Sequence, residues 1–249
     1  MLFYFTATGN SKFIADRIAD ATSEQTANIT DCVQNNRYLF ELADGDTVGL
    51  VLPVYFYGIP IIASEYLSKL TIRSQTPLYT YAVLNCGGST GDSARFIRKF
   101  LELDAVYGIK VTDNYVPMYK QKSIDVIEAQ LNAAEQTIDK IITSINERTT
   151  GTHNLVAGRL PRLLTAVAYP MYKNGRKTRK FKVSEKCNGC GLCEKICPRK
   201  IISCKDNKPL WTVPRCEECL ACLHRCPVAA IDYGKSADHG RYVNPRVEL

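Results

Sequence analysis

The residues best suited to chemistry are eight of the eleven cysteines, gathered near the end of the chain. They form two runs with the same spacing, Cys-x2-Cys-x2-Cys-x3-Cys-Pro, and the second run starts 29 residues after the first. Gaps of two residues let one short loop direct three thiolates at a single iron–sulfur cube, and the fourth cysteine of each run ligates the cube of the other run. The spacing therefore predicts two 4Fe–4S clusters. One ligand set is Cys187, Cys190, Cys193 and Cys226, and the other is Cys216, Cys219, Cys222 and Cys197.

Structural zinc and disulfide bonds are two other uses of clustered cysteines. A structural zinc site takes four ligands, typically from two Cys-x2-Cys pairs, so a third cysteine and a Cys-Pro in each run depart from that pattern. Disulfide bonds are typical of exported chains, whereas Met1 runs directly into Leu-Phe-Tyr-Phe with no basic segment of a signal peptide. We therefore expect metal-bound thiolates and a cytoplasmic protein, from an anaerobe because exposed clusters are sensitive to oxygen. Cys32 and Cys204 fall outside the pattern and are predicted to be structural thiols.

A second group of polar residues lies near the N-terminus, between a predicted strand at Leu2–Phe5 and a predicted helix at Lys12–Ala19. Free backbone N–H groups and the helix dipole can bind an anion in such a loop, and its hydroxyls add donors suited to a phosphate monoester. An ordinary helix cap is the alternative. The loop has neither the Gly-x4-Gly-Lys motif nor the Gly-x-Gly-x2-Gly motif of nucleotide-binding loops. The candidate ligands are Thr6, Thr8, Gly9, Asn10 and Ser11.

Two further loops follow Val48–Leu52 and Leu78–Leu84, apolar runs that predict central strands of a sheet covered on both faces. The first loop carries three aromatic residues, of which Tyr55 or Tyr57 is predicted to stack on a flat ring. The second is rich in glycine, which lets backbone approach such a ring. Core packing and a plain strand–helix turn are the alternatives. The candidates are Pro53, Val54, Tyr55, Phe56, Tyr57 and Gly58, and then Asn85, Cys86, Gly87, Gly88 and Gly91, with Cys86 expected as a small residue in a tight turn.

The N-terminal loop resembles the phosphate loop of the flavodoxins, Thr-x-Thr-Gly-x-Thr/Ser, at Thr6, Thr8, Gly9 and Ser11. The resemblance implies an α/β fold over residues 1–148, with a five-stranded parallel sheet and FMN at the carboxyl ends of the strands. Ala27–Ile29 and Ile109–Val116 are the predicted second and fifth strands. Ser123–Glu147 has the apolar stripe of an amphipathic helix and closes the unit.

The cysteine repeat resembles the bacterial two-cluster ferredoxins over residues 181–236, at the eight cysteines, both Cys-Pro pairs, Ile201 and Ile231. The resemblance implies a small α+β domain at residues 181–249 that transfers single electrons between protein partners. So short a segment cannot bury a large apolar core, and we therefore expect the clusters to hold its fold together.

Residues 149–180 are predicted to form a basic linker with an amphipathic helix that carries Leu160, Leu163, Leu164, Val167, Ala168 and Met171. We favour a bridge in which this helix packs against the flavodoxin-like unit. The alternative is a helix that lies on a membrane, with Arg159, Arg162 and the Lys173–Lys182 cluster toward the lipid. Gly151–His153 is expected to be a flexible start to the linker.

The net charge of +7 is unevenly distributed. Residues 1–150 carry 13 Lys and Arg against 17 Asp and Glu, a net charge of −4, whereas residues 151–249 carry 19 against 8, a net charge of +11. We favour cations that offset the negative clusters. The alternative is that they attract an acidic redox partner or anionic lipid. Nucleic acid is not expected, because no nucleic-acid-binding motif accompanies the charge.

The order of the two units resembles the flavodoxin–ferredoxin fusion proteins. That resemblance implies an electron-transfer protein that passes electrons between FMN, two 4Fe–4S clusters and unidentified redox partner proteins. Two alternatives remain, an FMN-dependent reductase of a small acceptor and a ferredoxin with a flavin-free docking scaffold. No acid–base pair stands out, since His153, His224 and His239 lie outside the flavodoxin-like half. His224 is predicted to be an exposed loop residue, and the oligomeric state is not predicted.

Overall fold

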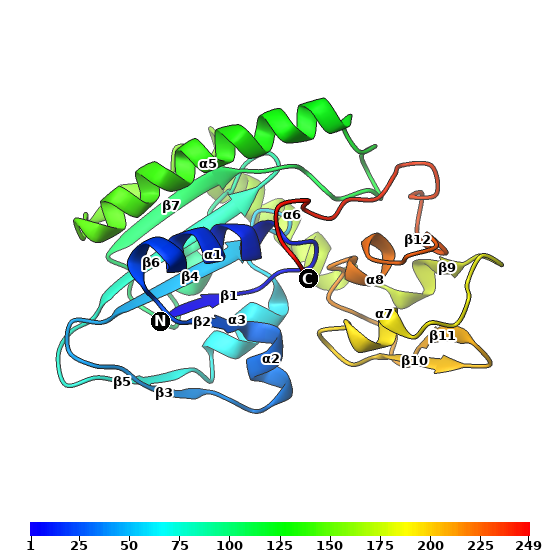
Figure 1. Cartoon of the computed structure of the whole chain (residues 1–249), viewed down its shortest axis with the longest axis horizontal. Coiled ribbons are helices and arrows are strands. Elements are labelled where there is room, and N and C mark those ends of the chain that lie inside the picture. Colours follow the sequence, from blue (N-terminus) through cyan, green and yellow to red (C-terminus); the bar gives the residue numbers. More distant parts are fainter.

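In the computed structural model, which describes residues 1–249, an α/β unit packs beside a smaller unit rich in loops (Figure 1). The α/β unit has a six-stranded sheet in the order β2-β1-β4-β6-β7-β8, in which every neighbouring pair is parallel. The predicted flavodoxin-like fold class is confirmed, with one strand more than expected. The strands are β1 (Leu2–Tyr4), β2 (Thr26–Asn28), β4 (Thr47–Pro53), β6 (Tyr79–Cys86), β7 (Ala105–Lys110) and β8 (Gly151–His153).

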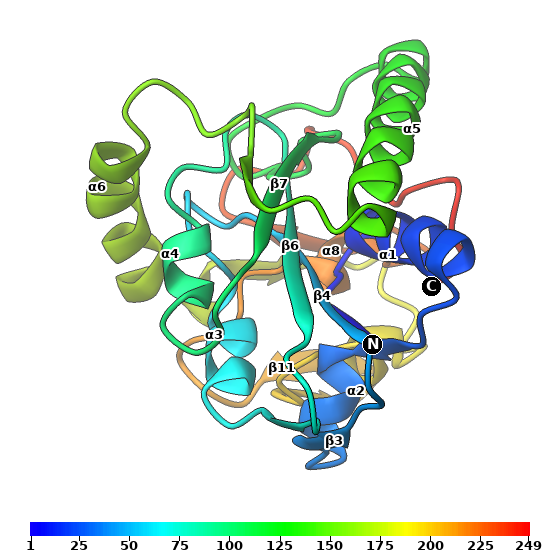
Figure 2. The same cartoon turned by 90° about the vertical axis from the view of Figure 1, so that its left-hand side faces the viewer.

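Helices cover both faces of the sheet, because its central strands are apolar on both sides (Figure 2). On one face, Ile14 of α1 and Ile138 of α5 share a core with Tyr81 and Val83 of β6. On the other face, Tyr66 of α3 shares a second core with those side chains of β1, β4 and β6 that point to this side of the sheet. The helices are α1 (Asn10–Thr22) and α5 (Ile124–Asn146) on the first face, and α2 (Ile29–Gln34), α3 (Ile61–Leu67) and α4 (Ala94–Ile97) on the second.

Two local predictions in this unit are wrong. The fifth strand spans Ala105–Lys110 and not 109–116, because the chain leaves the sheet after Lys110 and residues 111–119 form a loop beyond its edge. Gly151–His153, expected to be flexible, forms β8 beside β7. The N–H of Gly151 donates to the carbonyl of Asp104 at 2.7 Å, so the returning chain satisfies backbone groups of the edge strand. A separate two-stranded parallel ladder joins β3 (Leu39–Glu41) to β5 (Thr71–Arg73).

The smaller unit contains the cysteine repeat and little regular structure. Its core comprises only eight buried residues, and one of them, Val116, comes from the flavodoxin-like half. The antiparallel pairing of β9 with β12 joins the start of the unit to the end of the repeat. Its elements are η1 (Thr178–Lys180), β9 (Phe181–Val183), α7 (Leu192–Lys195), β10 (Ile202–Lys205), β11 (Lys208–Trp211), α8 (Ala221–His224) and β12 (Ile231–Tyr233).

The linker helix α6 (Pro161–Asn174) lies against the flavodoxin-like unit beside α4, as the bridge prediction requires (Figure 2). Its buried face is not the apolar stripe that the sequence suggested. The buried residues are Thr165, Tyr169 and Tyr172, which carry hydroxyls, whereas the leucines of the stripe are exposed. Hydrogen bonds explain this orientation, because the Tyr169 hydroxyl donates to the Ile59 carbonyl at 2.8 Å.

The C-terminal segment, residues 237–249, returns from the smaller unit to α1 and α5 (Figure 1). The N–H of Asn244 donates to the carbonyl of Thr8 at 2.8 Å. The Arg246 guanidinium forms ion pairs with Glu128 and Glu135 of α5 at 2.6 and 3.0 Å. The two units are thus joined at both ends of the smaller one. No helix of the structure has both the length and the apolar character that crossing a membrane requires.

Candidate functional site

A cavity of about 410 Å³ lies at the carboxyl ends of β1, β4 and β6, and we call it the central cavity. Its volume falls within the range of small-molecule sites, roughly 300–1,000 Å³. All three loops predicted from the sequence reach it. The predicted residues that line it are Thr6, Thr8, Asn10, Ser11, Pro53, Val54, Tyr55, Phe56, Tyr57, Asn85, Cys86, Gly87 and Gly88.

One end of the central cavity has the properties of a phosphate site. Gly9 is the N-cap of α1 and has no side chain to cap the helix, while its own N–H donates to the Thr6 hydroxyl at 3.1 Å. The first N–H groups of a helix have no partner within it, so those of the first turn are available to an anion. Hydroxyls of Thr6 and Thr8 lie in the same wall. These donors fit a phosphate monoester, because they supply hydrogen bonds without a fixed charge.

Contacts from distant segments hold this loop in place. The Ser11 hydroxyl donates to Asn85 Oδ1 at 2.9 Å, which connects the first loop to the third. Asn10 Oδ1 accepts hydrogen bonds from the Tyr242 hydroxyl at 2.6 Å and from Asn244 Nδ2 at 3.1 Å. The C-terminal segment therefore holds the predicted phosphate loop in place, a role that nothing in the local sequence indicates.

The aromatic loop forms a tight turn. The N–H of Tyr55 donates to the carbonyl of Gly58 at 2.9 Å, and the N–H of Gly58 donates to the carbonyl of Tyr55 at 3.0 Å. The two residues between them have positive φ angles, 50° for Phe56 and 63° for Tyr57. Side chains other than those of Gly, Asn and Asp rarely adopt this conformation, and such strain occurs at ligand sites. The Phe56 ring stacks on Tyr172 of α6, with centroids 5.6 Å apart and an angle of 11° between planes. Aromatic residues therefore form one side of the central cavity.

Three predicted glycines do not line the central cavity, namely Gly9, Gly58 and Gly91. A Cβ at Gly58 would lie 2.3 Å from the Tyr169 ring, and one at Gly91 would lie 2.7 Å from the Thr165 hydroxyl. A Cβ at Gly9 would lie 2.8 Å from the Val247 side chain. These glycines allow α6 and the C-terminal segment to pack closely against the loops, on the side of the loops that faces away from the cavity.

Sequence reasoning missed half of the cavity wall. Ala7 and Ser89 lie within the predicted loops, and the other additional residues come from the loop after β7, from α6 and from the second cysteine run, which the topology brings to one edge of the sheet. A cluster of polar and aromatic residues directly after an apolar strand was the only available signal, at residues 112–119. Cys219, predicted as a cluster ligand, also lines this cavity, and the missed residues are Ala7, Ser89, Val111, Thr112, Asp113, Asn114, Tyr115, Met118, Tyr119, Ala168, Met171, Tyr172, Glu218 and Leu220.

The cysteines surround two smaller cavities, and their grouping matches the crossed ligand sets. The outer cavity is lined by Cys187, Cys190, Cys193 and Cys226, and the inner cavity by Cys197, Cys216, Cys219 and Cys222. None of the eleven cysteines forms a disulfide. Each cavity thus has the four cysteine thiols of one predicted set in its wall, and four thiolates are the donor set that a 4Fe–4S cluster takes.

Hydrogen bonds from the backbone reach a sulfur in each cavity. The N–H of Glu218 donates to Cys216 Sγ at 3.2 Å, and the N–H of Ala230 donates to Cys226 Sγ at 3.3 Å. Such bonds tune the potential of an iron–sulfur cluster. The burial of the two cavities differs, because Cys197, Cys216 and Cys222 are buried whereas Cys190 is exposed.

Two carboxylates between Cys216 and Cys219 join the smaller unit to the rest of the chain. Glu217, only 1% exposed, accepts hydrogen bonds from the Tyr172 hydroxyl at 2.7 Å and from the N–H of Ile62 at 3.2 Å. The Arg199 guanidinium lies 2.7 Å from Glu217 and also pairs with Glu65 of α3. A charged group so deeply buried is tolerated only when it is paired and hydrogen-bonded. Glu217 thus connects the cluster loop, α3 and α6.

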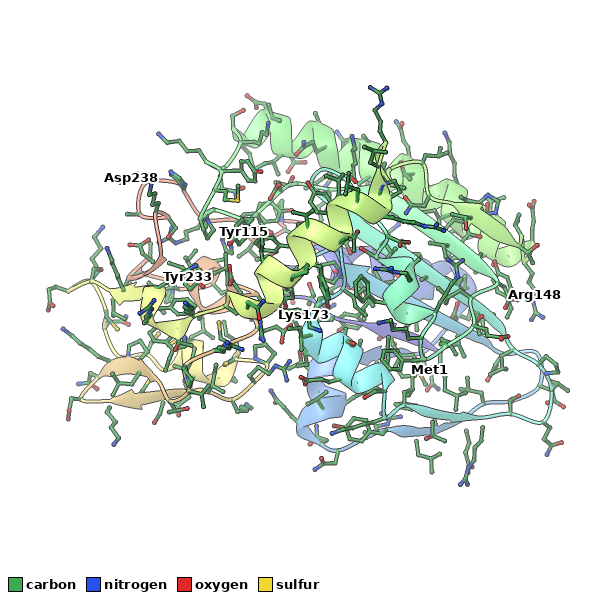
Figure 3. The ribbon with its side chains drawn as sticks, turned by 180° about the vertical axis from the view of Figure 1, so that it is seen from behind. Met1, Tyr115, Arg148, Lys173, Tyr233 and Asp238 are labelled. Atoms are coloured by element: carbon green, nitrogen blue, oxygen red, sulfur yellow. The ribbon has the colours of Figure 1, made fainter.

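Glu218 lies in the wall between the central and inner cavities. Its carboxylate accepts hydrogen bonds from the hydroxyls of Tyr115 at 2.5 Å and Tyr233 at 3.1 Å, on the cluster side of α6 (Figure 3). Burial and this nearby carboxylate raise the pKa of Tyr115 well above its usual range. Cys219 and Leu220 line the same two cavities. The inner ligand set therefore lies directly beside the central cavity.

The prediction for His224 is wrong. This residue is 4% exposed and lies in α8, where its Nδ1 accepts from the N–H of Tyr242 at 3.1 Å. Its Nε2 lies 2.9 Å from the carbonyl of Asn114, so the two contacts fix the neutral ring with the proton on Nε2. Burial lowers the pKa of His224 to about 4. The histidine connects the smaller unit to the loop after β7.

Two cysteines outside the ligand pattern lie beside the cavities. Cys86 is buried in the wall of the central cavity, where burial raises the pKa of its thiol to about 12, which does not favour a reactive thiolate. Cys204 lines the outer cavity as a fifth thiol. Its structural role stays a prediction.

Comparisons with known proteins match two separate parts of the chain. Residues 1–107 match the family model described as a flavodoxin domain, and residues 171–231 match the one described as a 4Fe-4S dicluster domain. No curated protein matches the chain.

Several solved structures are similar over part of the chain. The Trp repressor binding protein of Bacillus subtilis has 9% identity, covers 55% of this chain and 97% of its own, and has a TM-score of 0.31. The azoreductase AzrA covers 57% of this chain and 99% of its own, with 12% identity and a TM-score of 0.34. An azoreductase from Bacillus anthracis str. Sterne covers 57% of this chain and 98% of its own, also with 12% identity and a TM-score of 0.34.

The chain therefore combines a flavodoxin domain with a 4Fe–4S dicluster domain, in the order found in flavodoxin–ferredoxin fusions. It is an electron-transfer protein of the flavin and iron–sulfur type.

Proposed function

We propose that this chain carries electrons between external redox partner proteins and FMN through two 4Fe–4S clusters. FMN supplies two-electron chemistry and each cluster supplies one-electron transfer. In this proposal the outer ligand set faces the partner, the inner set follows, and the flavin occupies the central cavity. The protein is proposed to act in the cytoplasm.

The observation that carries the proposal is the wall shared by the central and inner cavities. Glu218, Cys219 and Leu220 line both of them, so a cluster on the inner set and a flavin in the central cavity would be separated only by these residues. The outer cavity has no lining residue in common with the central cavity. Exposure of Cys190 on the outer set supports that set as the contact with a partner.

The residues of the central cavity favour FMN over a flavin dinucleotide. An uncapped helix terminus with two threonine hydroxyls binds one phosphate group, and the Gly-x-Gly-x2-Gly loop of a pyrophosphate site is missing at this position. Tyr55 and Tyr57, both in the wall, are the proposed contacts of the ring. Flavin extracted from anaerobically purified protein and identified by chromatography tests this point, together with about eight iron and eight sulfide per chain, as two such clusters require.

The route is tested with Cys190→Ala in anaerobic protein and with a reduced two-cluster ferredoxin as the electron donor. We expect flavin reduction, followed by absorbance in a stopped-flow experiment, to fall at least roughly a hundredfold while FMN stays bound, because the outer cluster loses a ligand. Cys204→Ala is the matched control, since Cys204 lines the same cavity outside the ligand pattern. Unchanged flavin reduction in Cys190→Ala would contradict the route.

A further inference from the structure

The outward face of α6 carries a row of exposed apolar side chains. Leu160, Leu163, Val167 and Met171 are exposed to 61, 58, 61 and 65%, and Leu164 to 38%. Their spacing of three or four residues places them on one side of the helix. Figure 3 shows α6 crossing the face of the molecule toward the viewer, with Lys173 near its end and no other element in front of it.

The inward face of the same helix already has its partners. Thr165 donates to the Tyr57 carbonyl at 2.8 Å, and the Tyr172 hydroxyl donates to Glu217 at 2.7 Å. Helix α6 therefore contacts the rest of the protein through its hydroxyl-bearing residues, and the apolar side chains of the row remain exposed. A contiguous apolar patch on the surface of a protein marks an interaction site.

The charged residues of the segment that contains the row have one sign. Residues 149–184 contain eight Lys and Arg and no Asp or Glu. None of the eight forms an ion pair with another part of the chain, although other arginines such as Arg199 and Arg246 do. Arg159 and Arg162 lie at the start of the helix, and Lys173 and Lys177 lie at its end and beyond, all of them exposed. These four cations are thus available to anions outside the protein.

We propose that α6 binds the surface of an anionic membrane, with its apolar row in the acyl boundary and its cations on lipid phosphates. A helix with one apolar side and Lys and Arg as its only charges has the composition of interfacial helices. Arginine and lysine side chains are long enough to reach the headgroups while their methylene groups cover apolar surface. The helix lies flat on the molecule, so the whole row can meet a plane at once (Figure 2).

This binding would orient the central cavity. Ala168 and Met171 of α6 line that cavity, as do Met118 and Tyr119, which are 61 and 52% exposed. The cavity therefore opens beside the helix, and a protein bound through α6 would hold this opening near the lipid surface.

The test is sedimentation of the full chain with vesicles of phosphatidylcholine that contain about one third phosphatidylglycerol. We expect wild-type protein to sediment with these vesicles and not with pure phosphatidylcholine, and we expect binding to weaken as salt rises. Leu163→Gln with Val167→Gln should lower the partition coefficient at least roughly tenfold. Ile124→Gln with Val126→Gln on α5 is the matched control, since these residues are 62 and 42% exposed and lie outside the basic segment.

Three results of the sedimentation experiment would overturn the proposal: no binding of wild-type protein to anionic vesicles, equal binding to neutral ones, or equal binding of the α6 and α5 variants. Size-exclusion chromatography covers self-association. If wild-type protein is a dimer and the α6 variant is a monomer, the row contacts a second copy of this chain and not lipid. Flavin reduction by the ferredoxin donor without vesicles should be the same in both variants, which separates this proposal from the electron route.

Discussion

The two cysteine runs share one spacing but have different surroundings. Between its first two cysteines the first run has Asn188 and Gly189, whereas the second has Glu217 and Glu218. The two glutamates are buried against α3, α6 and the loop after β7, and the first run stays at the surface with Cys190 exposed. Spacing therefore decides which sulfurs share a cluster, and the intervening residues decide which surface that cluster meets.

The largest expected effect comes from removal of the clusters by anaerobic iron chelation. The smaller unit has a core of only eight residues, whereas each face of the sheet has a core of 19. We expect residues 181–249 to lose their fold without the clusters while the flavodoxin domain persists. Far-UV circular dichroism and limited proteolysis measure the difference. An unchanged spectrum, with no new cleavage in the cysteine repeat, would show that protein contacts alone hold this unit.

Glu217→Ala should have the next largest effect, because the substitution removes one of the two carboxylates that pair with Arg199, whose side chain is mostly buried. Breaking a buried, hydrogen-bonded ion pair costs about 3–5 kcal/mol, and Arg199 retains Glu65, so we expect the lower end of that range in thermal unfolding of the holo protein. The control is Glu185→Ala beside the first run, since the Glu185 carboxylate is 92% exposed in its pair with Lys208. This control should show no measurable change. Equal losses of stability in the two variants would mean that the contacts of Glu217 do not hold the second cysteine run against the rest of the protein.

Glu218→Gln should act on the flavin more than on stability. The amide keeps the size of the side chain but replaces a charged acceptor for the Tyr115 and Tyr233 hydroxyls. Hydrogen bonds to charged groups contribute more than neutral ones, so we expect FMN to bind roughly tenfold more weakly, measured by fluorescence titration. Asn188→Ala in the first run, away from the central cavity, should leave FMN affinity unchanged. A similar loss of FMN affinity in both variants would contradict the conclusion that only the second cysteine run adjoins the central cavity.

Tyr242→Phe should have the smallest effect. It removes the 2.6 Å hydrogen bond to Asn10 but keeps the buried ring. One neutral hydrogen bond contributes about 1 kcal/mol, so FMN affinity should fall about fivefold in the same titration. Tyr38→Phe, whose ring packs on Tyr66 away from the phosphate loop, serves as the control. An unaltered affinity in Tyr242→Phe would mean that the C-terminal segment does not support the phosphate site.

Local patterns were enough to predict much of the site. The four-cysteine groups, the phosphate loop and the two loops after the central strands all lie where the sequence indicated. The reason is that ligand spacing and strand–loop–helix order are properties of short segments. The α5 prediction, Ser123–Glu147, agrees with the observed Ile124–Asn146 for the same reason, since an apolar stripe over many turns is a strong local signal.

Long-range contacts account for what the sequence did not predict. The apolar stripe of α6 suggested a buried face, yet hydrogen bonds to the aromatic loop and to Glu217 turned Tyr169 and Tyr172 inward. His224 lies between two cysteine ligands in a short loop, which suggested exposure, but contacts with Asn114 and Tyr242 bury it. Each of these partners is distant in sequence or belongs to the other unit, so no local pattern indicated the contact.

The sequence by itself determined the α/β architecture and the two groups of four cysteines, and it predicted a phosphate loop, because each depends on the spacing of nearby residues. Only the tertiary structure decided which cluster site adjoins the central cavity, which face of α6 meets the solvent and what holds the phosphate loop. Those features depend on packing between segments far apart in the chain, where Glu217, Glu218 and the C-terminal segment fix the arrangement of the two units.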